Sequence, residues 1–407
     1  RNCHIDLTLP PCLFVQSWRG QNSLHCHPFV SAPNFSIGIG SLSTEIHQKK
    51  RIVSMNSPVM TGYTSFFMPS EWQPPPHPEA IGSWWREQQF HNSPSGPLGA
   101  SSLPMPLRVI ADAEERDVSS GKAFLRGFYG AEGPAGSFDV DSRPFSGSFG
   151  PSCPEVSSEE KHQLVTERLL EFPEEADFPA LLQRMWQLMG PSAAGDWTNW
   201  PCDVDEASGK LTGPCSAAHS FSERFMMEWG AGERFAWGRG HVSEIAELIR
   251  AHIWYRNVQH GAPKLVAREQ ASIFAALLSE LQSPHSGTTI FMGHDTQMNA
   301  LTTGLGLSWR PTPFPDSAMM PASAIHLRRI GDVVEAEYLY IPNPSILSGE
   351  LMRVPATFQS SGEASLPLTS FTNLAETAYN PSCANSPPRH RPAALFSWDF
   401  INSLVYT

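Results

Sequence analysis

The clearest hydrophobic pattern in the chain is a pair of short apolar runs, each followed at once by polar residues and then by a helical periodicity. The first run covers residues 107–112 and leads into a helix around residues 119–127. The second covers residues 288–292 and leads through residues 293–296 into another apolar helix. Short apolar runs bounded by turn residues indicate buried strands, and repeated strand–turn–helix units indicate an α/β fold.

Between these two units the pattern is helical. Ser157 and Glu160 have the spacing of a capping box at the start of a helix that runs to about Glu171. Further helices are expected at residues 178–190, 216–229, 242–258 and 266–282. Beyond the second apolar run, alternation predicts a strand at residues 333–341. We therefore predict a helical region inserted between strands of an α/β domain.

The N-terminal part of the chain is less regular. Residues 1–50 show weak periodicity, residues 51–55 form a candidate strand, and residues 80–90 a candidate helix. The chain has 37 prolines among 407 residues, which favours many turns and ordered loops.

Charge and hydropathy exclude several classes of protein. The 28 basic and 40 acidic side chains give a net charge of −12, which argues against binding to nucleic acid or to an anionic membrane. No apolar stretch approaches the roughly 18 to 20 residues that span a bilayer, and residues 1–30 show no apolar run of signal-peptide type. With 41% apolar residues, the chain is not disordered along its whole length.

The seven cysteines favour disulfides over a metal site. No Cys-x-x-Cys pair is present, which disfavours a zinc ribbon. His25, Cys26 and His27 are adjacent, and neighbouring residues of an extended chain point to opposite faces, so they rarely bind one ion. We expect no metal and no cofactor. A Cys202–Cys215 bond is disfavoured because Cys215 lies near a helix start. The pairing stays open for five cysteines: Cys3, Cys12, Cys26, Cys202 and Cys215.

Two strand ends carry the candidate chemistry. His294 and Asp295 follow the strand at residues 288–292 and begin a helix, and Arg116 follows the strand at residues 107–112. Ligands of open α/β sheets bind at such strand ends, and a helix N-terminus favours anions. An Arg fork and a His suit phosphate, and an Asp can protonate a leaving group. Taken alone, Asp295 is as readily an N-cap and Arg116 a surface residue paired with a neighbouring Glu. Together they predict an anion site.

In this combination the sequence resembles the histidine acid phosphatases, in particular the bacterial phytase and glucose-1-phosphatase branch. The resemblance covers residues 78–383. Its blocks, in order, are residues 109–116 with 121–124, 211–214 with 217–225, 237–239, 259–268, 291–299 and 367–383.

The resemblance implies a phosphoglycerate-mutase-like (histidine phosphatase) sheet domain with an inserted α-helical domain. The sheet domain would comprise residues 51–149 and 286–383, and the insert residues 150–285; residues 1–50 and 384–407 would be a non-matching extension and tail. It also implies a disulfide between Cys153 and Cys383. Members of the family are usually periplasmic or secreted.

The same resemblance assigns roles to site residues. Arg116 and His294 would bind phosphate, Asp295 would be the proton donor, and Glu223 would belong to the substrate pocket. The reaction would be phosphomonoester hydrolysis at acid pH through a phosphohistidine, without metal. The substrate would be a small phosphorylated polyol, such as a sugar phosphate or an inositol phosphate, with neither nucleic acid nor membrane as partner. The sequence does not indicate the oligomeric state.

The chain departs from the family at the nucleophile, and no Arg-His-Gly occurs in it. The segment after the candidate strand at residues 51–55, residues 56–63, contains neither His nor Arg. His260 precedes a Gly but is interpreted as structural. Three other histidines in range lack the flanking Arg and Gly: His47, His77 and His91. The nucleophile is therefore unknown, and the chain is expected to be impaired as written.

Three accounts fit this departure: a non-catalytic relative that binds phosphate esters, a shifted reading frame in the N-terminal stretch, or a substitute His. We favour an altered phosphatase sequence over a dedicated binding protein. An unrelated α/β protein with a chance match would instead place Arg116 and His294 far apart.

Overall fold

A computed structural model describes residues 107–129, 137–172, 178–190, 201–230, 234–283, 288–342 and 351–385, together with Glu79, Gly82 and Ser83. The extension at residues 1–50, the candidate strand at residues 51–55, nearly all of the candidate helix at residues 80–90 and the tail from residue 386 lie outside the described residues.

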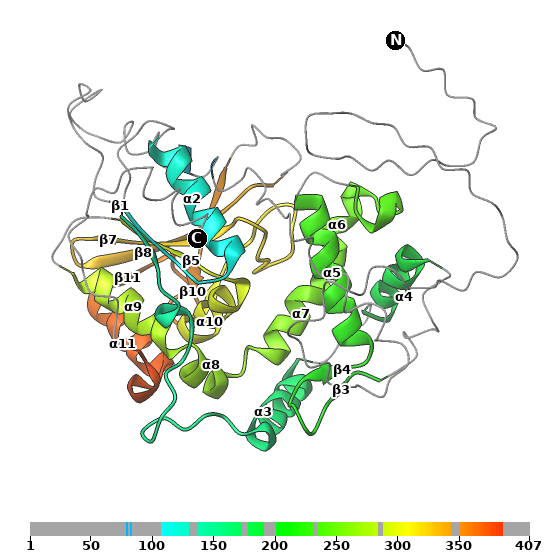
Figure 1. Ribbon diagram of the computed structural model, residues 1–407, viewed down its shortest axis with the longest axis horizontal. Helices are drawn as coiled ribbons and strands as arrows, with labels where there is room; N and C mark the ends of the chain where they lie inside the picture. The colour runs from blue at the N-terminus through cyan, green and yellow to red at the C-terminus, as the bar shows by residue number, and fades with distance from the viewer. Residues whose placement is uncertain are drawn as a thin grey trace, which may run out of the picture. The chain divides into compact units, whose positions relative to one another are not determined.

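Figure 1 shows the arrangement of the described strands and helices. The strands are β1 (Leu107–Ala111), β2 (Ser137–Val140), β3 (Asp203–Val204), β4 (Leu211–Thr212), β5 (Thr288–Met292), β6 (Leu307–Ser308), β7 (Ala324–Ile330), β8 (Val333–Tyr340), β9 (Met352–Pro355), β10 (Thr357–Phe358) and β11 (Ser365–Pro367). The α-helices are α2 (Glu115–Tyr129), α3 (Ser158–Glu171), α4 (Phe178–Met189), α5 (Pro214–Gly230), α6 (Ile245–Leu248), α7 (Arg250–Gln259), α8 (Pro263–Glu269), α9 (Ala271–Gln282), α10 (Asp295–Leu305) and α11 (Leu368–Ala378).

The two apolar runs are neighbouring strands of one parallel sheet. Its order is β2-β1-β5, with Val109 paired to Ile290 and Ala111 to Met292. The apolar side chains of β1 are buried, and helix α2 packs on β1 and β5. Figure 1 shows α2 on one side of the strands and α9 with α11 on the other. The predicted α/β class is confirmed, and because the register aligns the strand ends, the polar residues that follow each strand meet at one edge.

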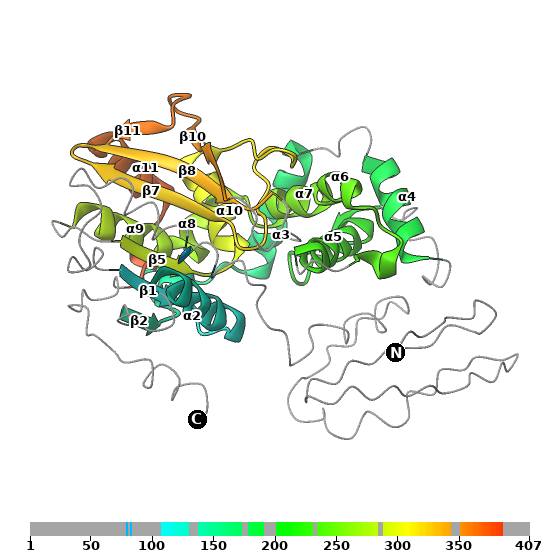
Figure 2. The ribbon, with the colours of Figure 1, turned by 90° about the horizontal axis from the view of Figure 1, so that it is seen from above.

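A second, antiparallel sheet follows the parallel one in the chain (Figure 2). β8 pairs with β7, β9 and β11, which confirms the strand predicted at residues 333–341. Its buried face is aromatic: the rings of Trp309 and Tyr338 stack with centroids 4.6 Å apart. Tyr338 also accepts a hydrogen bond from the backbone N–H of Met320, so its buried hydroxyl is satisfied.

The helices between β2 and β5 match the sequence pattern in place but not always in continuity. The Ser157 hydroxyl accepts a hydrogen bond from the Glu160 N–H and caps α3 as expected. The single helix predicted at residues 242–258 is wrong: a short 3₁₀ turn, Val242–Glu244, precedes α6, and α7 begins after Ile249. The predicted helix at residues 266–282 breaks at Gln270, whose side chain accepts a hydrogen bond from Gln297. Tertiary contacts there override a continuous apolar period.

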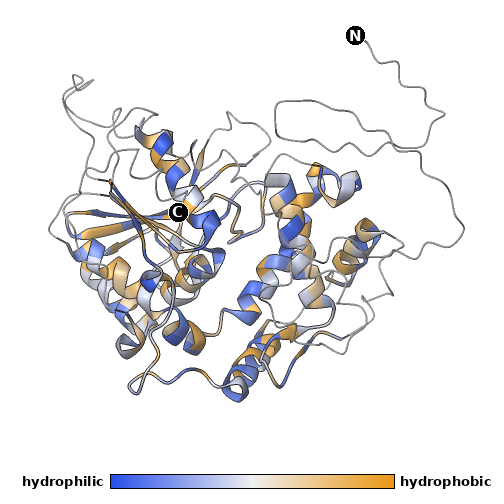
Figure 3. Cartoon of the chain, in the orientation of Figure 1, coloured by the Kyte–Doolittle hydropathy of each residue, from blue (hydrophilic) through white to orange (hydrophobic). Residues whose placement is uncertain are grey.

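Apolar sides of these helices face a core that they share with the antiparallel sheet. Polar and apolar residues alternate around α5 and α7 (Figure 3). Phe225 of α5, Phe274 of α9 and Tyr338 of β8 belong to one continuous apolar cluster. The division into a sheet domain and an insert, with boundaries near residues 150 and 285, stays a prediction. The helices among the described residues lack the length of apolar sequence that a bilayer crossing needs.

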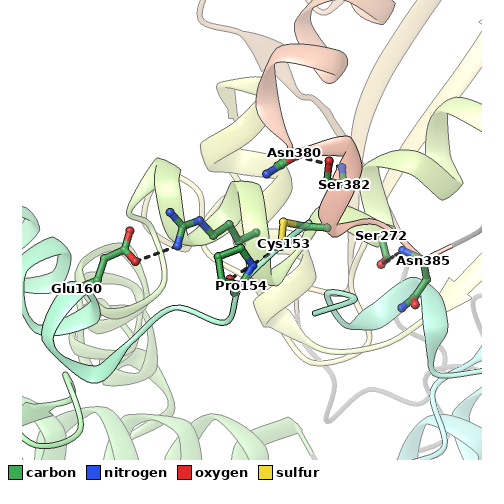
Figure 4. The surroundings of a disulfide bond; sticks show 9 residues. Cys153, Pro154, Glu160, Ser272, Asn380, Ser382 and Asn385 are labelled. Atoms are coloured by element: carbon green, nitrogen blue, oxygen red, sulfur yellow. Dashed lines mark hydrogen bonds and ion pairs between the residues drawn. A yellow bond between two sulfur atoms is a disulfide. The ribbon is translucent and has the colours of Figure 1, made fainter. Parts of the chain in front are cut away.

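Two disulfide bonds are present among the described residues. Cys153 bonds to Cys383, with the two Cα atoms 5.1 Å apart, as the resemblance implies. Figure 4 shows this bond beside Asn385, whose N–H donates to the Ser272 hydroxyl. Cys202 bonds to Cys215, so the expectation against that pair is wrong. The antiparallel β3–β4 hairpin is the reason, because it folds Cys202 back to the start of α5.

Candidate active site

Arg116 and His294 meet at the adjoining ends of β1 and β5. Arg116 lies in the first turn of α2, and His294 is the N-cap residue of α10. Arg116 Nη2 lies 3.2 Å from His294 Nδ1. The His294 N–H donates to Gln297 Oε1 at 2.8 Å, which fixes the backbone where the imidazole departs. A chance match in an unrelated α/β protein would have placed these two side chains far apart, whereas here they are in contact.

Two carboxylates share this edge with them. Asp117 of α2 is 5% exposed, and its Oδ2 lies 3.3 Å from His294 Nδ1. Asp112 accepts hydrogen bonds from the Ser142 hydroxyl and the Ala113 N–H. The edge therefore combines two cationic or hydrogen-bond-donating groups with two acids. An incoming anion must compete with Asp117 for His294.

Asp295 faces a different set of partners. Its Oδ2 lies 2.9 Å from His252 Nε2, and its Oδ1 lies 2.6 Å from Arg256 Nη2. Arg256 Nη1 also donates to the Thr296 hydroxyl at 2.9 Å, so α7 grips the first turn of α10. Burial opposes ionisation of Asp295, but the hydrogen bond to His252 and the charge of Arg256 outweigh it and hold its pKa below the ordinary value.

Glu223 lies on α5, in a group with His219 and His252. Glu223 Oε2 is 3.8 Å from His219 Nε2 on the same helix. The His219 ring stacks on Tyr255, with centroids 3.9 Å apart and planes 4° from parallel, and also faces His252. Burial, together with the nearby His252 and Arg256, lowers the pKa of His219 to about 2. His219 is therefore neutral across the physiological range.

The structure thus brings the predicted residues into two adjoining groups: Arg116 with His294, and Asp295 with its partners from α7. His252 links Asp295 to the Glu223 group. The catalytic and substrate-binding roles of the four residues stay predictions. His260 is the half-buried C-cap of α7, and partial burial of its ring lowers its pKa to about 3, in keeping with a structural role. His47, His77 and His91 lie outside the described residues.

Sequence reasoning missed His252, Arg256, His219 and Asp117. His252 falls on the apolar face of its helix, and four residues on comes Arg256, so both would be expected in contact with buried neighbours. A His and an Arg at that spacing on a buried face are a signal for a buried acidic partner. Asp117 directly follows Arg116, and only the course of α2 shows that it turns toward His294.

Comparison with known proteins supports the fold. No family model matches the chain, and no curated protein matches it by sequence. Among solved structures, the Citrobacter braakii phytase matches with a TM-score of 0.61 at 18% identity, over 79% of this chain and 91% of that one. The apo phytase of Hafnia alvei matches with a TM-score of 0.60 at 18% identity, over 84% of this chain and 92% of that one.

A further structure is the Hafnia alvei phytase in complex with myo-inositol hexakis sulphate, with a TM-score of 0.58 at 18% identity, over 76% of this chain and 88% of that one. All three neighbours are bacterial phytases. The resemblance to the histidine acid phosphatases, predicted from the sequence, is confirmed at the level of fold.

Proposed function

We propose that the chain is a phosphomonoester hydrolase of the histidine acid phosphatase type that acts at acid pH on a small phosphorylated polyol. The observation that carries the proposal is the approach of Arg116 to His294, 3.2 Å apart at adjoining strand ends, with Asp295 next in sequence. A guanidinium and an imidazole so close together form a clamp for a dianionic phosphate. The sulfated inositol bound by the Hafnia alvei phytase supports a phosphorylated cyclitol or sugar as the substrate class.

In the proposed reaction Arg116 and His294 hold the phosphate while a histidine still to be identified attacks phosphorus. Asp295 protonates the departing alcohol, and water then releases the phosphoryl group from the histidine as inorganic phosphate. Glu223 contributes to the pocket that receives the alcohol. For Asp295 to donate, it must first gain a proton, and the ion pair with Arg256 opposes this. Acid pH and a substrate phosphate that shifts local charge both favour protonation. Because the nucleophile motif is missing, turnover is expected to be impaired.

A second candidate function is binding of phosphate esters without turnover. One observation favours it: Asp295 is held as a carboxylate by Arg256 and His252, the state in which it cannot serve as an acid. Such a protein would keep the clamp of Arg116 and His294 and lose only the chemistry. Both candidates place the chain in an oxidising compartment, periplasmic or extracellular, with which the two described disulfides are compatible.

The deciding experiment is p-nitrophenyl phosphate hydrolysis near pH 5. Asp295→Asn is the test variant, and Asp316→Asn, which changes an exposed Asp, is the matched control. A hydrolase should lose about 100-fold or more in kcat with Asp295→Asn and nothing with Asp316→Asn. Phosphoenzyme trapping would then identify the histidine that serves as nucleophile.

Absence of turnover in folded protein would leave phosphate binding as the question. Binding of inorganic phosphate that Arg116→Ala abolishes would support the binding protein, and the coding DNA around Asn56 would test the frame account. Turnover that Asp295→Asn leaves unchanged would overturn the assignment of the acid. Neither turnover nor phosphate binding would overturn both functions.

A further inference from the structure

Three potential metal ligands lie together beside the candidate active site. The proposed hydrolysis gives them no common role. His219 and Glu223 come from α5, and His252 comes from α7. One ligand atom from each residue lies within 4.8 Å of the others. His219 and Glu223 are four residues apart on one helix, a spacing that places two ligands on the same face.

The chemistry of these groups suits a borderline divalent cation. Zinc prefers imidazole nitrogen with carboxylate oxygen, and a set of two His and one Glu leaves a fourth position open. In both His219 and His252 the Nδ1 atom is buried and has no hydrogen-bond partner among the described residues.

The ligand group is open to solvent on one side and packed against other side chains on the other. The Glu223 side chain is 33% exposed, so an ion can reach the group from solvent on that side. Tyr255 stacks on His219 and supports its ring, while the other face of the group is the 1%-exposed His252. The His219 and His252 rings lie 4.8 Å apart and 24° from parallel, so the two imidazoles face each other within the group.

We propose that His219, Glu223 and His252 form a Zn²⁺-binding site, and that the proposed hydrolysis does not require the ion. The absence of a Cys-x-x-Cys pair led us to expect no metal, and this proposal departs from that expectation. His252 also contacts Asp295, so an ion here would alter the candidate acid. That consequence rests on the proposed function and predicts inhibition by zinc, but the binding site itself does not depend on activity.

The test is zinc binding by the full chain, measured by competition with a chromophoric chelator at pH 7. The metal-free protein should bind one Zn²⁺ in this site, and Glu223→Gln and His219→Asn should each weaken that binding by more than about tenfold. The matched control is His326→Asn, since His326 also lies beside a Glu, 3.4 Å from Glu337, but belongs to no three-ligand group among the described residues. Circular dichroism shows that each variant is folded.

Cobalt provides a second measurement, because a four-coordinate site gives Co²⁺ a strong visible absorption that Glu223→Gln should remove. Glu223 is partly exposed, so this variant keeps the test valid even if His219→Asn does not fold. Zinc affinity unchanged in a folded Glu223→Gln variant would overturn the proposal. Binding lost instead in Asp112→Asn would do the same, because it would locate the ion with Asp112, Asp117 and His294.

Discussion

His294 and Asp295 are consecutive residues with opposite surroundings. His294 turns to α2, where it meets Arg116 and the carboxylate of Asp117. Asp295 turns to α7, where Arg256 and His252 each hold one of its oxygens. Around His294, positive and negative side chains lie together, and an incoming anion could replace the carboxylate of Asp117. Around Asp295, both carboxylate oxygens already have partners, so we call this the closed network.

The difference separates two tasks. A site that binds an anion needs positive groups that are not fully neutralised. Among the described residues, Asp117 is the carboxylate that contacts His294, and Asp112 lies close by. A residue that must change its protonation state needs a pKa near the working pH, and the Asp295 network drives it away from that range. Of the two proposed roles, phosphate binding by Arg116 and His294 therefore fits its surroundings better than proton donation by Asp295 does.

The largest expected effect comes from opening the closed network. Arg256→Met leaves a largely buried carboxylate without its cation, and we expect the free energy of unfolding to fall by about 2–4 kcal/mol. Urea titration at pH 7 measures this. Arg310→Met is the control: its pair with Asp316 is exposed, at 87% and 66%, and its loss should cost less than about 0.5 kcal/mol. Equal, small losses in both variants would show that the Asp295 network is not closed.

Acidification should weaken the same side of the site. The pKa values of His219 and His260 lie at about 2 and about 3 in the folded chain, below the ordinary 6.5. The unfolded chain therefore takes up protons first, and stability falls as the pH drops below about 6.5, with the loss complete only near the folded values. At pH 5 each of these two histidines should cost up to about 2 kcal/mol.

Urea unfolding at pH 7, 6 and 5 measures this slope, and His260→Gln should make it shallower. A wild-type stability that stays constant over this range would contradict the burial of neutral histidines. The result also sets a requirement for any assay at pH 5, where the folded state must be verified.

A smaller effect, on phosphate affinity, is expected around His294. Asp117→Asn removes the carboxylate that competes for His294 and keeps its size, so inorganic phosphate should bind about three- to tenfold more tightly. Isothermal titration calorimetry measures the dissociation constant. Asp332→Asn, the same change at an exposed turn, should leave it unaltered. Weaker phosphate binding in Asp117→Asn would mean that Asp117 orients His294 instead of competing for it.

Local sequence signals were sufficient for the elements that present the site. The apolar runs at β1 and β5 and the Ser157 cap of α3 are properties of a few neighbouring residues, and all three are found. The breaks at Ile249 and Gln270 were not predictable, because the apolar period continues across both. At Gln270 the side chain bonds to Gln297 of another helix, a contact that local sequence does not show.

The contacts of the site residues also divide into those that local sequence predicts and those that depend on distant parts of the chain. His294 and Arg116 could be expected to meet, since each follows a strand of one sheet. The ion pair of Asp295 with Arg256 joins residues of different helices, so the sequence could indicate a buried acidic partner for Arg256 but not which acid it is. The Cys202–Cys215 bond was missed because it depends on a hairpin of two-residue strands, too short to leave a periodic pattern.

The pairing of β1 with β5 has a consequence for the order in which the chain can fold. Leu107 pairs with Thr288, and all the helices from α2 to α9 lie between them in sequence. During synthesis, β1 leaves the ribosome with one of its two edges unsatisfied, and its partner arrives only after those helices have been made. Such distant pairing slows folding and leaves an apolar strand exposed to wrong contacts. The nascent chain should therefore depend on chaperones until β5 emerges and completes the edge at which His294 meets Arg116.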